Sequence, residues 1–311
     1  MPPNIGKVGL KKDIDVGILN VVKFVTGHPL NKHREVRALF EFAKWQIGSR
    51  LVPGAVVFDW INGSRFLVRR GETGLTGNVY AGLHEFADMA FLLHFLRKED
   101  VFIDVGANVG SYTILASAAV GCNAYAFEPI PATFQRLTAN LRLNNLDDRV
   151  NALNVGIGSS VCEMAFTVGL DTVNHVVSIG EDSTNSVLVK VAPLDQVLIG
   201  ESPTMIKIDV EGYETPALEG ATHTLRSPSL KVVIMELNGS GSRYGYDEAK
   251  ILELMLDLGF ESFSYDPFRR ILTNLKGKNL SSGNTLFLRD HQFVCDRLDS
   301  APKIVIHDWS L

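Results

Sequence analysis

Short apolar runs separated by polar, glycine-containing turns dominate the central part of the chain. Such runs are typical of strands that are buried on both faces in a parallel sheet. We predict strands of this kind at residues 101–105, 123–127, 149–153, 205–209 and 231–236. Apolar residues at helical spacing follow several of these runs, as at residues 131–144, and predict helices that cover the sheet. This alternation predicts an α/β fold with a doubly wound, mostly parallel sheet.

The stretch before the first of these strands shows a different pattern. Apolar residues at helical spacing, Val36 and Phe40 among them, predict an amphipathic helix over residues 35–47, whose apolar stripe ordinarily faces the core. An Asn-Gly pair at residues 62–63, between two β-prone runs, predicts a hairpin. Residues 16–26 predict a short helix that packs on the domain. Lysines precede it, so contact of this basic, partly apolar start with a membrane surface is the alternative.

The pattern divides the chain into three parts. We expect an N-terminal helical and hairpin extension over residues 1–83, an α/β domain over residues 84–290 and a C-terminal tail over residues 291–311. Residues 71–86 predict a glycine-rich, polar loop that leads into a buried helix over residues 85–96. We expect a lid-like insertion at residues 161–191, because a long polar loop separates two strand-like runs there.

Composition and charge narrow the function classes. A chain of 311 residues is long for one hydrophobic core and short for two full domains. Its net charge of −5 supplies no positive field that would attract nucleic acid. No apolar run approaches the ~20 residues that span a bilayer, so we predict no transmembrane segment. The start of the chain lacks the apolar region of a signal peptide. The three cysteines form no zinc or redox motif, so we expect a cytoplasmic protein, and a homodimer is compatible with these features.

The stretch VFIDVGANVGSYT, residues 101–113, predicts a strand, a glycine-rich turn and a helix. Such a turn lets a ligand approach the backbone closely and directs helix N-terminal amides toward it. The motif reads D-x-G-x-N-x-G and differs from the dinucleotide-binding motif G-x-G-x-x-G. A carboxylate at Asp104 would repel a pyrophosphate but suits a ligand that carries an amine. S-adenosylmethionine carries a sulfonium and an ammonium group, so we predict that Asp104, with Gly106 and Gly110, binds its methionyl part.

Glu128 ends the second predicted strand, at the position where an acid accepts hydrogen bonds from ribose hydroxyl groups. Enzymes that use NAD share this feature, so Glu128 indicates a ligand that contains adenosine but does not distinguish S-adenosylmethionine from NAD. The turn at residues 154–160 follows the third strand and is expected near the adenine.

Four motifs together resemble the FkbM-type S-adenosylmethionine-dependent methyltransferases. They are FIDVGANVGSYT, AFEPIPATF, KIDVEGYE and VIMELNGSG, and TGNVYAGLHEF and NTLFLRD extend the resemblance to about residues 76–290. The resemblance implies a Rossmann-like, class I methyltransferase sheet of seven strands, the last antiparallel. It also implies methyl transfer to a hydroxyl group of a sugar, glycan or secondary metabolite, so the expected partner is a small-molecule or glycan acceptor.

Carried over by position, the resemblance assigns the methionyl part to the Asp104 turn and the ribose to Glu128. The full set of predicted cofactor-binding residues is Glu85, Asp104, Gly106, Asn108, Gly110, Ser111, Glu128, Asn154 and Asp209. The predicted acceptor-binding residues lie in three polar stretches and are His84, Asn174, His175, Asn238 and Arg243.

A hydroxyl acceptor needs a base, or a metal ion that lowers its pKa. Asp209 and Glu211 follow the fourth strand and are the predicted catalytic acids, with His175 as a further candidate. Asp209 could instead join Glu236 in holding magnesium or calcium, since both offer oxygen ligands, but no metal site is predicted. Glu214 is assigned to the start of the next helix. Two other functions stay open from the sequence, an NAD(P)-dependent oxidoreductase and a non-catalytic binding module on the same fold.

Overall fold

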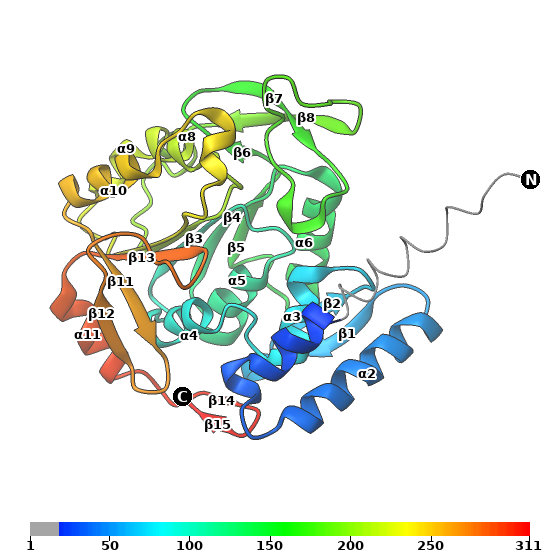
Figure 1. Cartoon of the computed structure of the whole chain (residues 1–311). Coiled ribbons are helices and arrows are strands. Elements are labelled where there is room, and N and C mark those ends of the chain that lie inside the picture. The colour runs from blue at the N-terminus through cyan, green and yellow to red at the C-terminus, as the bar shows by residue number, and fades with distance from the viewer. Residues whose placement is uncertain (1–18) are drawn as a thin grey trace, which may run out of the picture.

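A computed structural model of the chain describes residues 19–311 and contains a central sheet of eight strands (Figure 1). The strands lie in the order β12-β11-β13-β10-β9-β3-β4-β5. Strands β3, β4, β5, β9 and β10 are parallel to their neighbours within this group, and they confirm the five predicted strands. Their bounds are Val101–Val105, Asn123–Phe127, Val150–Leu153, Met205–Ile208 and Val232–Glu236.

One half of the sheet is antiparallel. Strand β13 (Asn284–Leu288) pairs antiparallel with both β10 and β11 (Glu261–Asp266), as the family resemblance implies for the last strand. Strand β12 (Ile271–Asn274) forms an eighth, edge strand beyond the seven expected. Its residues are mostly exposed, so no apolar run marked it in the sequence.

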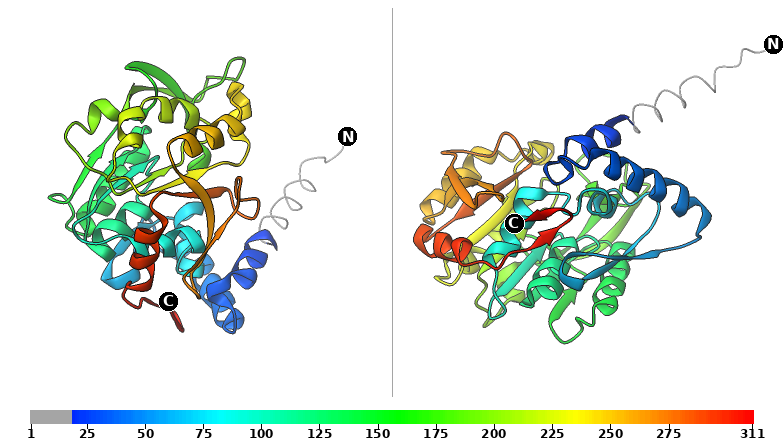
Figure 2. Two further views of the ribbon diagram at one scale, coloured as in Figure 1. Left: turned by 90° about the vertical axis from the view of Figure 1, so that its left-hand side faces the viewer. Right: turned by 90° about the horizontal axis from the view of Figure 1, so that it is seen from below.

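Helices cover both faces of the sheet (Figure 2). One face packs against α4 (Phe86–Phe95), the short α5 (Ser111–Ile114) with its π-helical continuation, α6 (Pro131–Leu143) and α11 (His291–Asp299). The other packs against α7 (Leu194–Val197), α8 (Glu214–Glu219), α9 (Thr222–Arg226) and α10 (Glu248–Asp257). Side chains of β3 alternate between the two cores, with Phe102 in the first and Ile103 in the second, as a strand buried on both faces requires.

An N-terminal layer lies against one end of the sheet and has its own small core. Residues 19–27 are helical, while the first residues of the helix predicted at 16–26 lie outside the described part. Helix α2 (Glu35–Leu51) and the hairpin of β1 (Val56–Asp59) and β2 (Arg65–Val68) are present as predicted. The side of α2 that packs inward carries Ala38, Phe42 and Trp45.

Two predictions for this layer are wrong. Residues 73–81 form helix α3 (Thr73–Ala81) rather than a loop, and Leu75 and Val79 on it are buried. The glycines of this segment have low helix propensity, so the sequence did not indicate a helix. Gly77 is required because a Cβ there would lie 2.6 Å from the His84 ring. Most of the apolar face predicted for α2 does not pack inward: Val36, Phe40 and Ile47 are exposed, and only Leu39 of that face contacts the N-terminal core.

The predicted insertion is a small three-stranded sheet in the order β6-β8-β7, at the top of Figure 1. Strands β7 (Cys162–Thr167) and β8 (Ser186–Ala192) are antiparallel, which confirms the predicted strand pair, and β6 is Gly156–Ile157. At the C-terminus, β14 (Val305–Ile306) and β15 (Trp309–Ser310) form a hairpin that reaches the N-terminal layer, where Trp309 Nε1 donates to the Leu30 carbonyl at 3.1 Å. Within residues 19–311, every helix is too short or too polar to cross a membrane.

Candidate active site

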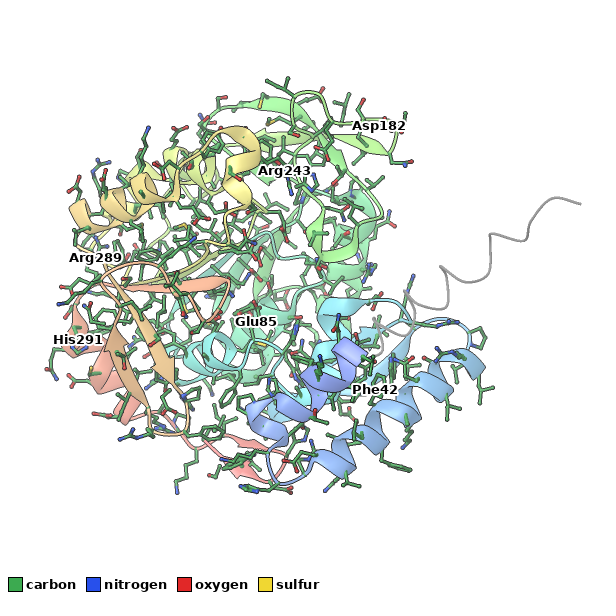
Figure 3. The ribbon with its side chains drawn as sticks, viewed as in Figure 1. Phe42, Glu85, Asp182, Arg243, Arg289 and His291 are labelled. Atoms are coloured by element: carbon green, nitrogen blue, oxygen red, sulfur yellow. The ribbon has the colours of Figure 1, made fainter. Side chains whose placement is uncertain are left out.

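A cavity of about 330 Å³ opens at the carboxyl ends of β3, β4, β9 and β10. Ligands of open α/β sheets bind at this edge. The predicted residues that line it are His84, Glu85, Asp104, Gly106, Asn108, Ser111, Glu128, Asn174, Asp209 and Glu211. Figure 3 shows Glu85 near the centre of the molecule. The structure thus brings together residues that lie more than a hundred positions apart in the chain.

The turn after β3 requires glycine at two positions. Gly106 has a φ of +81°, and a Cβ there would lie 1.8 Å from the Asp209 carbonyl oxygen. Gly110 has a φ of +93°, and a Cβ there would lie 2.6 Å from Leu137 Cδ1. Gly106 therefore lets the β3 turn and the β9 turn touch along the cavity wall, whereas Gly110 lies behind the wall and lets α5 approach α6.

Asp104 lies beneath the turn and is almost fully buried. Its Oδ2 accepts hydrogen bonds from the backbone N–H of Thr113 at 3.1 Å and from the Thr113 hydroxyl group at 2.5 Å. Burial raises the pKa of Asp104 to about 6, against the opposing effect of Lys207. Asp104 thus holds the start of α5 and offers its other oxygen toward the cavity, where the predicted contact with an amine remains a prediction.

Glu128 lies between the turns that follow β3 and β4. Its Oε2 accepts from the Asn108 N–H at 3.0 Å, and its Oε1 accepts from the Ile130 N–H at 2.9 Å. Burial raises the pKa of this carboxyl group to about 7. Apolar side chains continue the cavity wall beyond it, namely Phe127, Ile130, Val155, Ile157 and Phe166. A carboxylate next to an apolar slot fits a ribose followed by a flat base.

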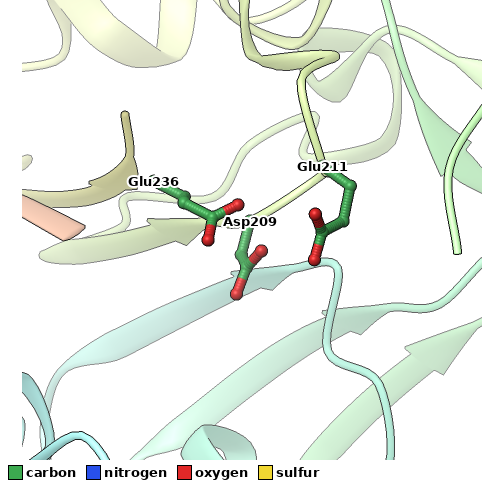
Figure 4. A group of neighbouring side chains, drawn as sticks. All are labelled: Asp209, Glu211 and Glu236. Atoms are coloured by element: carbon green, nitrogen blue, oxygen red, sulfur yellow. The ribbon is translucent and has the colours of Figure 1, made fainter. Parts of the chain in front are cut away.

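Three carboxyl groups converge at the other end of the cavity (Figure 4). Asp209, Glu211 and Glu236 each offer an oxygen atom, and these atoms lie within 4.8 Å of one another. Asp209 Oδ2 also lies 2.5 Å from Nζ of Lys207, which is buried. Burial by itself would lower the pKa of Lys207, but Asp209, Glu85 and Asp104 raise it above its usual range. Because Lys207 already supplies the counter-charge of Asp209, the cluster has less need of a metal ion.

Within residues 19–311, neither Glu211 nor Glu236 forms a direct ion pair of this kind. Burial, then Asp209 and Glu214, raise the pKa of Glu211 to about 7. Burial, then Asp209 and Glu211, raise the pKa of Glu236 well above its usual range, and Glu236 Oε2 is buried without a hydrogen-bond partner among residues 19–311. Glu211 is therefore a carboxyl group that changes its protonation near neutral pH beside an open cavity, which is the property of a general base.

Glu214 has the role predicted for it at the helix start. Its Oε1 accepts from the backbone N–H groups of Val210 and Gly212, so it closes the turn before α8. Arg243 lies over the ring of Tyr244 and reaches the Glu211 carbonyl oxygen at 3.4 Å from outside the cavity.

Three other predicted site residues use side-chain atoms in hydrogen bonds within the protein. His175 is buried, with Nδ1 2.9 Å from the Val173 carbonyl oxygen and Nε2 2.9 Å from Glu181 Oε1, so neither ring nitrogen faces a substrate. Asn154 Nδ2 donates to the carbonyl groups of residues 128 and 129, and Asn238 Oδ1 accepts from the Ser240 N–H. With Gly110 and Arg243, these residues lie outside the lining of the cavity.

Sequence reasoning missed two residues of the site. Lys207 lies within an apolar strand, and a single cation in such a run was the signal available. Tyr112 lines the cavity beneath Lys207, whose Nζ lies 4.7 Å from the ring centre.

Replacing Glu236 by glutamine should stabilise the fold in neutral and mildly alkaline solution. The pKa of Glu236 in the folded state lies above the ordinary value of 4.5, so stability that is present below that value is lost as the pH rises toward the folded-state pKa. Glutamine removes this loss. The Tm of Glu236→Gln should exceed that of the wild type at about pH 8 and approach it at about pH 4. The exposed Glu253 provides the control Glu253→Gln, and a Tm gain that is absent or independent of pH would contradict the prediction.

The comparisons with known proteins agree with this geometry. A family model described as the methyltransferase FkbM domain matches residues 104–262, just over half of the 311 residues. The chain is 32% identical over 169 residues to the hexuronic acid methyltransferase AglP of Haloferax volcanii, covering 53% of this chain and 64% of that protein. It is 37% identical over 84 residues to the 31-O-demethyl-FK506 methyltransferase FkbM of Streptomyces tacrolimicus, covering 26% of this chain and 32% of that protein.

The chain thus spans less than two thirds of the length of these curated relatives. Among solved structures, an rRNA methylase from Streptococcus thermophilus is similar at 14% identity and a TM-score of 0.39, covering 64% of this chain and 91% of that chain.

Proposed function

The chain belongs to the FkbM methyltransferase family, and from this premise we propose that it transfers a methyl group from S-adenosylmethionine to a hydroxyl group of a neutral sugar or a similar metabolite. The cofactor supplies the electrophilic methyl group, and the protein supplies placement and proton transfer. Family membership removes the basis for the oxidoreductase alternative. The non-catalytic alternative predicts cofactor binding without turnover, so a methyl-transfer assay separates it from this proposal.

The observation that carries the proposal is the pairing of Gly106 with Glu128 at one cavity. The close contact of the turns after β3 and β9 at Gly106 places Asp104 and Asp209 beside the same cavity, and Glu128 lies buried beside an apolar slot. This combination fits an adenosyl group. Carboxylates at Asp104 and Asp209 beside the same turn suit the positive charge of the methionyl part.

The acceptor end of the cavity favours an uncharged hydroxyl compound. Its lining contains one lysine, which is paired, and the carboxyl groups of Glu85, Asp209, Glu211 and Glu236. An acidic acceptor would bring a further carboxylate beside acids whose burial and mutual repulsion already raise the pKa values of Glu211 and Glu236, at a cost that burial increases. The relative from Haloferax volcanii is named for a hexuronic acid, so we propose that the acceptors differ in charge although both carry sugar-type hydroxyl groups.

Calorimetry with S-adenosylhomocysteine tests the cofactor. We expect binding in the micromolar range and no heat with NAD. Glu128→Gln should weaken the affinity about tenfold, because a hydrogen bond to a charged acceptor is lost. Glu163 is an exposed acid on β7, and Glu163→Gln should leave the affinity unchanged. An absence of S-adenosylhomocysteine binding by the folded wild-type protein would overturn the proposed function.

A further inference from the structure

Helix α2 is apolar on two opposite sides. Its inner side packs on the N-terminal core through Ala38, Phe42 and Trp45. Its outer side carries four exposed apolar residues, Val36 at 83%, Phe40 at 69%, Ile47 at 63% and Leu51 at 76% exposure. They are spaced 4, 7 and 4 positions apart, which places them on a single stripe of a helix with 3.6 residues per turn. A contiguous apolar patch on a protein surface ordinarily marks an interaction site, so this outer stripe is expected to have a partner.

Cations flank the stripe. Arg37, Lys44 and Arg50 are exposed on α2, and Lys32 is exposed just before it. The two acids of the helix offset only part of this charge. Glu41 is half-buried and paired with Arg34 and Arg37, and Glu35 accepts a hydrogen bond from the His33 N–H. The outer surface of α2 therefore combines an apolar stripe with a positive border on a chain whose net charge is −5.

An apolar cavity lies on the opposite, inner side of α2. Trp45 and Trp60 line this cavity of about 660 Å³ between α2, the β1–β2 hairpin and the C-terminal hairpin. Figures 1 and 2 show α2 along the outer edge of the molecule, away from α10 and the small β6-β8-β7 sheet.

We propose that α2 docks on the surface of an anionic phospholipid membrane. Its stripe of Val36, Phe40, Ile47 and Leu51 enters the acyl-chain boundary, while the flanking cations contact the headgroups. The chain would lie on the membrane without spanning it. The proposal goes beyond the methyl-transfer function and does not depend on it.

Charge argues for a membrane over a second copy of this chain. A two-fold dimer formed through the stripe would place two antiparallel α2 helices face to face. Exposed cations on the same flank would then oppose each other, with Lys44 of one helix near Lys44 of the other. An anionic surface instead neutralises all of these charges at once.

Vesicle co-sedimentation of the full chain tests the proposal. At low salt the protein should sediment with vesicles that contain phosphatidylglycerol and only weakly with vesicles of phosphatidylcholine alone. Added salt should release it. The double substitution of Phe40→Glu with Ile47→Glu should reduce the bound fraction about tenfold or more, because it removes two inserted apolar side chains. Both positions are exposed, so Tm and S-adenosylhomocysteine affinity should stay unchanged.

The matched control is Ile199→Glu with Leu256→Glu, at two exposed apolar positions outside the N-terminal layer. This control should sediment like the wild type. Failure of the wild type to bind phosphatidylglycerol vesicles, or equal losses in both double variants, would overturn the proposal. So would a dimer in size-exclusion chromatography that the α2 variant alone dissociates, because a second copy would then cover the stripe.

Discussion

Replacing Glu211 by glutamine should lower kcat by roughly 10²–10⁴-fold and leave the affinity for S-adenosylhomocysteine nearly unchanged. An aliphatic hydroxyl group is a weak nucleophile until its proton is removed, so the reaction requires a base at the acceptor end of the cavity. Glu211 lies there with a pKa raised to about 7 by burial and then by Asp209 and Glu214. Glutamine keeps the size of the side chain and removes its ability to accept the proton.

The pH profile provides an independent check. A base acts in its ionised form, so kcat/KM of the wild type should rise as the pH increases through about 7, and this step should be absent from the residual activity of Glu211→Gln. Steady-state methyl transfer, measured with the acceptor once it is known, gives both quantities. The exposed Glu219 on α8 supplies the control Glu219→Gln, which should retain the wild-type kcat.

Asp209 is the competing candidate. Its Oδ2 lies 2.5 Å from the buried ammonium group of Lys207, so the ion pair occupies one of its two carboxylate oxygens and favours the ionised form. If Asp209→Asn abolishes turnover with intact cofactor affinity while Glu211→Gln retains near-normal kcat, then Asp209 is the base. If turnover of the wild type is lost after exhaustive chelation and returns with magnesium, the three carboxyl groups hold an ion and Glu211 acts as a ligand.

The parts of the fold that depend on local pattern could be predicted from the sequence. The five parallel strands are short apolar runs, and the D-x-G-x-N-x-G turn shows its chemistry within seven residues. Glu128 was assigned to the cofactor from its place at a strand end, and it lines the cavity. These features need only neighbouring residues to be recognised.

The predictions that failed share a different cause. In each case the contact that decides the role of the residue is formed with a part of the structure that its neighbours in the sequence do not reveal. His175 in a polar loop could have served a substrate, but its hydrogen bonds to Glu181 and the Val173 carbonyl group exist only once the loop has folded. The apolar periodicity of α2 predicted one buried stripe. The side that packs on the N-terminal core is instead the one that carries Ala38, Phe42 and Trp45. The raised pKa of Lys207 depends partly on the nearby carboxylates of Asp104 and Glu85, which belong to other elements of the fold.

Replacing Gly106 by alanine should destabilise the protein by about 2–5 kcal/mol. The left-handed φ of +81° costs a non-glycine residue about 1–2 kcal/mol. The new Cβ would also lie 1.8 Å from the Asp209 carbonyl oxygen, which is backbone and can yield only by moving the β9 turn, and overpacking of this kind costs about 1–3 kcal/mol more. Chemical denaturation measures the loss in the free energy of unfolding.

Gly200 separates the two costs because it has nearly the same backbone conformation without the collision. Its φ is +84°, and a Cβ there would meet nothing within 4 Å. Gly200→Ala should therefore lose only about 1–2 kcal/mol and keep its S-adenosylhomocysteine affinity. Gly106→Ala should in addition bind the cofactor at least about tenfold more weakly, because the displaced β9 turn carries Asp209 and Glu211 along the same wall. Equal stability losses in the two variants, with cofactor affinity intact in both, would show that the contact between the β3 and β9 turns does not shape the site.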